Sequence, residues 1–108
     1  MQRMSFPIER ETWVETAIVA KWVLQEAWFY CIEVLEQRYK NRQVTALEKR
    51  KQEQMYTTFF HQAFYAPAKT KLDIEKLVKN ARKMLSILKK LDHDAWVRFM
   101  TTTDNEGG

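Results

Sequence analysis

Residues 13–35 are the longest predominantly apolar stretch of the chain, and they contain neither glycine nor proline. At about 100° of rotation per residue, a helix over this stretch collects its apolar side chains on one broad face. The residues of that face are Trp13, Ala17, Ala20, Leu24, Ala27, Trp28, Cys31 and Leu35. Polar residues such as Lys21 and Glu33 fall on the opposite arc. The pattern predicts a long amphipathic helix against which the other segments pack.

Three large apolar side chains of the same stretch lie within its polar arc. They are Ile18, Trp22 and Phe29. A helix that is apolar on two sides is either buried on both sides or carries a second contact surface. We therefore treat these three residues as candidates for binding a protein partner.

Start signals divide the chain into further helices. Pro7 suits the first turn of a helix, so the first helix is expected over about residues 8–41. Thr45 and Glu48 have the spacing of a capping box, which predicts a second helix over residues 46–66. A single continuous or kinked helix is the alternative that the sequence leaves open.

The second helix has an aromatic-rich half that is expected to pack on the first. Its residues are Met55, Tyr56, Phe59, Phe60, Ala63, Phe64 and Tyr65. Thr70 and Asp73 repeat the capping-box spacing and predict a third helix that ends near Leu91. This segment has the clearest amphipathic pattern in the chain, with its stripe at Ile74, Leu77, Val78, Ala81, Met84, Leu85, Leu88 and Leu91.

A short last helix is expected after the third, with Asp92 or Asp94 as its cap and one face formed by Trp96, Phe99 and Met100. No stretch alternates with the period of a strand, and only two glycines and two prolines interrupt the chain. We therefore expect an all-α fold, a compact bundle of three long helices and a short C-terminal one. Residues 1–108 are expected to form one domain, ordered over about residues 8–100 and flexible over residues 101–108.

One cysteine, Cys31, excludes an internal disulfide, and its apolar surroundings predict a buried thiol. The beginning of the chain is polar and does not resemble a signal peptide. Charged residues interrupt the apolar stretches before they reach the length of a membrane span. The expectation is a soluble cytoplasmic protein without a membrane partner.

The sequence does not favour catalysis. His61 lies in an aromatic stretch, where a core or boundary histidine is expected, and no nucleophile motif accompanies it. Asp92, His93 and Asp94 could supply metal ligands, but no further ligand stands at the spacing of a metal site. Both glycines lie at the end of the chain, so no loop can cradle a phosphate. We expect no enzymatic activity, cofactor, metal or small-molecule substrate.

The net charge of +4 is distributed unevenly. Residues 38–51 carry +5 and residues 69–91 carry +6, whereas the remainder of the chain carries −7. Segregated basic residues can neutralise phosphates and release counterions, although a solvated surface is the alternative. The candidate nucleic-acid-binding residues are Arg38, Lys40, Arg42, Lys49, Arg50, Lys51, Lys76, Lys79, Arg82, Lys83 and Lys90. Trp22, Phe29 and Tyr39 could stack on unpaired bases, with a place in the core as the alternative.

A small helical chain that combines these two basic segments with an aromatic-rich bundle resembles the small helical subunits of CRISPR effector complexes. The resemblance is architectural, covers about residues 8–100 and rests on no diagnostic motif. It implies a non-enzymatic subunit of a ribonucleoprotein that holds a target or displaced strand, single-stranded DNA or RNA, beside other subunits or copies of itself. It implies that this strand is contacted by Lys76, Lys79, Lys83 and Lys90. The alternative is a protein–protein adaptor or inhibitor, for example phage-encoded, that docks through its aromatic stripe.

Overall fold

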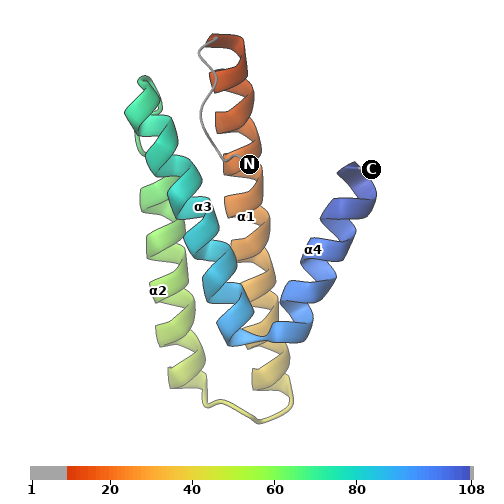
Figure 1. Ribbon diagram of the computed structural model, residues 1–108. Coiled ribbons are helices and arrows are strands. Elements are labelled where there is room, and N and C mark those ends of the chain that lie inside the picture. Colours follow the sequence, from red (N-terminus) through yellow and green to blue (C-terminus); the bar gives the residue numbers. More distant parts are fainter. Residues whose placement is uncertain (1–9, 108) are drawn as a thin grey trace.

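The computed structural model describes residues 10–107, and the side chains of residues 12–102. Over the described residues the chain forms helices and no strand, which confirms the all-α prediction (Figure 1). The four helices are α1 (Arg10–Lys40), α2 (Ala46–Phe64), α3 (Lys71–Leu91) and α4 (His93–Gly107). The predicted helix start at residue 8 lies outside the described residues. None of the helices in the described part is long and apolar enough to cross a lipid bilayer.

A left-handed residue separates α1 from α2, so the two helices are not continuous. Arg42 has a φ of 61°, a conformation that glycine usually supplies at helix ends. The Gln43 N–H donates to the Arg38 carbonyl at 2.8 Å, and the Arg42 N–H donates to the Tyr39 carbonyl at 3.0 Å. These two bonds form a Schellman motif, which satisfies carbonyls at the end of α1.

Both predicted capping boxes are present and fix where α2 and α3 begin. The Thr45 hydroxyl accepts from the Glu48 N–H at 3.1 Å, and the Glu48 carboxylate accepts from the Thr45 N–H at 2.8 Å. Thr70 and Asp73 make the same reciprocal pair, with both bonds at 3.1 Å. Each box satisfies N–H groups that would otherwise lack a partner at the helix start.

The core lies where α1 meets α2 and α3, and α1 packs most extensively against α3. The predicted central face of α1 is buried at Ala20, Leu24, Ala27, Cys31 and Leu35. The predicted stripe of α3 is buried at Ile74, Leu77, Ala81, Met84 and Leu88. Trp28 joins α1 to α2, because its ring stacks on Phe60 at 4.7 Å and its Nε1–H donates to the Thr57 hydroxyl at 3.0 Å.

Two residues of the aromatic-rich half of α2 do not pack on α1 as expected. Met55 is 59% exposed and Tyr65 is 72% exposed. Tyr56, Phe60 and Ala63 fill the face of α2 that is turned to the core. Tyr65 is the C-cap residue that follows α2, about 180° around the helix from Tyr56, so it projects into solvent.

The last helix is longer than expected. It runs through Gly107, so the residues predicted to be a flexible tail from Thr101 onward are helical. No glycine or proline interrupts the chain between Asp92 and Gly107, and extending a helix costs little once its first turn has formed. Phe99 is buried, but Figure 1 shows α4 leaning away from α1 toward its C-terminal end.

Candidate nucleic-acid interface

A row of lysines runs along the outer face of α3. Lys76, Lys79, Lys83 and Lys90 are exposed, and at about 100° per residue they project between about 140° and 200° from the buried Ile74. The row spans about 21 Å at 1.5 Å per residue. None of the four forms an ion pair with another described residue. We call these four residues the α3 lysine row.

The α3 lysine row borders α2. The Lys83 ammonium lies 5.2 Å from the ring centre of Phe59, which gives this side chain a cation–π contact with α2. Figure 1 shows α2 and α3 running in opposite directions, so Lys51 and Lys90 both lie toward the same end of the molecule from this contact. Lys51 is exposed in the first half of α2.

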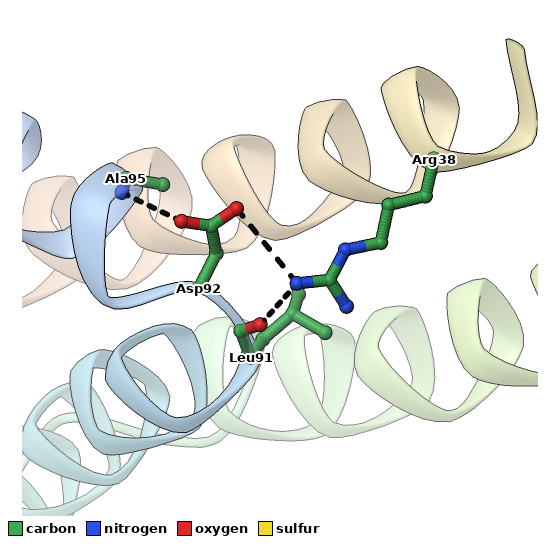
Figure 2. A network of polar contacts seen from close by, with 4 residues as sticks. All are labelled: Arg38, Leu91, Asp92 and Ala95. Atoms are coloured by element: carbon green, nitrogen blue, oxygen red, sulfur yellow. Dashed lines mark hydrogen bonds and ion pairs between the residues drawn. The ribbon is translucent and has the colours of Figure 1, made fainter. Parts of the chain in front are cut away.

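Arg38 is held within the protein. One guanidinium nitrogen donates to the Leu91 carbonyl and lies 3.8 Å from the Asp92 carboxylate. Asp92 in turn accepts from the Ala95 N–H at 3.0 Å, as the cap of α4 that the sequence predicts (Figure 2). The side chains of Arg38 and Asp92 are each one third exposed. Arg38 thus ties the end of α1 to the junction between α3 and α4.

Lys49 is also engaged by its own chain. Its ammonium lies 2.9 Å from the Glu53 carboxylate and 3.1 Å from that of Glu36, and 5.6 Å from the ring centre of Tyr39. Hydrogen bonds to Glu53 and then Glu36 raise the pKa of Lys49 above its usual value. Two carboxylates therefore compensate this charge, and Lys49 contributes little to a positive surface.

The remaining candidate residues fall into two groups. Lys40, Arg42 and Arg50 are exposed around the connection between α1 and α2. Arg82 is exposed on α3; it lines a groove with Val19 of α1, and it also lines a hollow with Lys76, Lys79 and Lys83 of the α3 lysine row. The structure thus brings Arg82 together with the α3 lysine row and leaves Lys51 on α2 and a group at the α1–α2 connection. The other two candidates, Arg38 and Lys49, bind within the protein.

The predicted stacking residues lie on α1, away from the α3 lysine row. Trp22 is 40% exposed, Phe29 48% and Tyr39 44%. The ring of Trp22 lies 6.3 Å from that of Phe99 on α4, whereas Phe29 makes no ring contact with another described residue. These aromatic side chains belong to a different face of the bundle from the lysines of α3.

Ile18, Trp22 and Phe29 form an exposed stripe on α1, which we call the α1 stripe. Ile18 is 62% exposed and is the most open of the three. The structure also exposes Val14 and Val19, at 51% and 58%, which the sequence analysis did not select. Val14 could have been found from its place one helical turn before Ile18.

The structure also places the histidine and cysteine that the sequence analysis considered. His61 is exposed, contrary to the expectation of a core or boundary residue, because it lies on the outer side of α2. Burial raises the pKa of the Cys31 thiol to about 12, so it is protonated at neutral pH. Within the described residues, no three histidine, cysteine, aspartate or glutamate side chains come together to hold a metal ion.

The chain matches no protein-family model, and no curated protein or solved structure is significantly similar to it. The resemblance to small subunits of CRISPR effector complexes therefore remains a hypothesis. The function has to be argued from the arrangement of charge and apolar surface on the chain itself.

Proposed function

We propose that this protein binds the phosphate backbone of a nucleic acid without enzymatic activity and without reading base sequence. The observation that carries the proposal is the α3 lysine row, in which four exposed lysines follow one helix and form no ion pair with another described residue. A polyanion that lies along α3 would release counterions as the lysines neutralise its phosphates. Lys51 would extend that contact onto α2.

The proposed ligand is single-stranded DNA or RNA. Helices that read base pairs usually enter the major groove with several base-contacting side chains. The outer face of α3 instead carries lysines, which suit contacts with the phosphate backbone. The α3 lysine row instead provides charge at intervals of three, four and seven residues, which suits contacts with successive phosphates. The resemblance to CRISPR small subunits favours a role as one subunit of a larger ribonucleoprotein. The subunit would be a bundle of three long helices and a fourth, C-terminal helix.

The test is a salt titration with a variant in which Lys76, Lys79, Lys83 and Lys90 are all replaced by glutamine. The fold should remain, because substitutions at exposed positions usually change stability by about 0.5 kcal/mol or less each. If each lysine meets one phosphate, the slope of log affinity against log salt should flatten by up to about four units on a duplex, or about three on a single strand.

A matched control has glutamine at Lys21, Lys69, Lys71 and Arg98, which removes the same charge from residues outside the α3 lysine row. The control should retain most of the salt dependence. Equal loss in both variants would show that net charge alone attracts the nucleic acid. An unchanged affinity and slope in the first variant would leave the row as solvated surface and would favour protein binding.

A second candidate function is protein–protein contact through the α1 stripe, as an adaptor or inhibitor. The exposure of Ile18 and Phe29 favours it, because large apolar side chains in water are typical of partner-binding surfaces. Its salt dependence should be weak. A pull-down from the native host after nuclease treatment would identify such a partner, and Phe29→Ala should capture less of it. The thermal melt of the Phe29→Ala variant should be nearly unchanged.

A further inference from the structure

One aromatic ring lies directly beside the α3 lysine row. The Lys83 ammonium is over the ring of Phe59 on α2, 5.2 Å from its centre. Three further lysines of the described part lie over an aromatic ring, namely Lys21, Lys49 and Lys89. None of these three belongs to the α3 lysine row. Phe59 is therefore the aromatic side chain that the structure brings to the proposed phosphate-binding residues.

The ring of Phe59 is held in place by the core but is not paired with another ring. Phe59 is half-buried and packs against the hydrophobic core. It makes no ring contact with another aromatic residue of the described part, in contrast to Phe60, which stacks on Trp28. A ring that is already ordered loses little conformational entropy when a ligand stacks on it.

A flexible side chain covers Phe59 on the side of the α3 lysine row. Lys83 is exposed, and a cation–π contact at an exposed site is weak. A phosphate that attracts the Lys83 ammonium would draw it away from the ring. The ring would then be open to another part of the molecule that carries the phosphate.

The hollow beside Lys83 can receive that phosphate. Its volume is about 660 Å³, within the range of about 300–1,000 Å³ that is typical of ligand sites. The lining residues are Lys76, Lys79, Asn80, Arg82, Lys83 and Ser86. Four of these side chains are cationic, and the Asn80 amide and the Ser86 hydroxyl can donate hydrogen bonds. Lys83 thus borders both a hollow suited to a phosphate and an aromatic ring suited to a base.

We propose that Phe59 stacks on an unpaired base of the strand whose backbone the α3 lysine row holds. This inference rests on the nucleic-acid binding proposed above and extends it to a base contact. Stacking on an aromatic ring tolerates every base, because each base has a π face, so Phe59 adds affinity without reading sequence. The bases of a duplex are already stacked on one another, so Phe59 adds nothing to duplex binding. The stacking residue is accordingly Phe59 of α2, and not Trp22, Phe29 or Tyr39 of α1.

The experiment compares two fluorescein-labelled strands on the full chain by fluorescence anisotropy. One is an oligothymidylate of about 12 nucleotides, within the size range of sequence-independent single-strand sites. The other is an abasic strand of the same length and charge. Wild-type protein should bind the oligothymidylate about tenfold more tightly, because one base stacked on an aromatic ring changes affinity by about that factor. The slope of log affinity against log salt should be the same for both strands, since both carry the same phosphates. Oligouridylate repeats the comparison for RNA.

Three variants locate the base on the protein. Phe59→Leu should bind the two strands with equal affinity and keep the wild-type salt slope, because leucine removes the π face and leaves the lysines in place. Its affinity for a duplex of the same length should stay within about twofold of wild type. Phe59→Tyr keeps an aromatic ring and should keep the preference for oligothymidylate.

Phe64→Leu is the matched control. Phe64 is also half-buried on α2 beneath a lysine, but that lysine is Lys21 of α1, whose ammonium lies 5.3 Å from the ring centre. The control should bind both strands like wild type. Thermal melts establish that each variant is folded.

Three results would overturn the inference and leave the proposed backbone binding intact. They are equal wild-type affinity for the two strands, a preference for oligothymidylate that survives in Phe59→Leu, and loss of that preference in Phe64→Leu as well. The first result needs no variant, so it decides the matter even if Phe59→Leu does not fold. Absence of salt-dependent binding of either strand to wild-type protein would instead refute both the backbone binding and the stacking.

Discussion

Replacement of Arg38 by methionine should destabilise the protein without changing how it binds nucleic acid. Methionine retains much of the length of the side chain but removes the donor to the Leu91 carbonyl and the ion pair with Asp92. A hydrogen bond from a charged group contributes about 1.5–3 kcal/mol, and the lower end applies because the side chain is one third exposed. The ion pair, at 3.8 Å and partly solvated, adds between about 0 and 1 kcal/mol.

The expected loss is therefore about 2 kcal/mol. At about 4 °C per kcal/mol for a chain of this size, the melting temperature should fall by about 8 °C. Urea unfolding followed by circular dichroism would measure the free energy, with an unchanged slope showing that the same surface is exposed. Arg50→Met is the matched control, because Arg50 is exposed and forms no ion pair with another described residue.

The assignment of Arg38 to the α3–α4 junction would be refuted by one combination of results. Arg38→Met would have to melt like Arg50→Met while reducing the salt dependence of nucleic-acid binding by about one unit, the loss of one phosphate contact. Arg38 would then belong with the basic candidates, as the sequence analysis placed it.

Three further predictions concern single residues. Arg42→Gly should stabilise the protein by up to about 1 kcal/mol in urea unfolding, because glycine adopts the left-handed conformation without the steric cost of a Cβ atom; a less stable variant would contradict this. Iodoacetamide should label Cys31 in native buffer far more slowly than in urea, by mass spectrometry, since burial raises the pKa of its thiol to about 12. N–H bonds from Lys69 and Thr70 hold the pKa of Asp73 below its usual value, so their stabilisation is complete above about pH 4 and is lost as pH falls through the folded pKa. Urea midpoints should accordingly fall less steeply with acid in Asp73→Asn than in wild type.

Local features of the sequence were sufficient for the helices and for much of the core. Thr45 with Glu48, and Thr70 with Asp73, determine helix starts because both members of each box lie within one helical turn. The buried stripe of α3 also follows from periodicity alone, since Leu77 and Leu88 are fixed on one side by the helix itself. The same rotation places the α3 lysine row on the other side.

The sequence by itself determined which helical face each side chain occupies; the tertiary structure decided what that face meets. Arg38 appeared to be a free cation because its partner, the Leu91 carbonyl, stands 53 residues away and is brought to it only by packing of α1 against α3. The groove beside Val19 likewise depends on how α1 and α3 pack, because its lining residues come from both helices. Periodicity describes one helix at a time, whereas ion pairs and grooves depend on the distance and angle between helices.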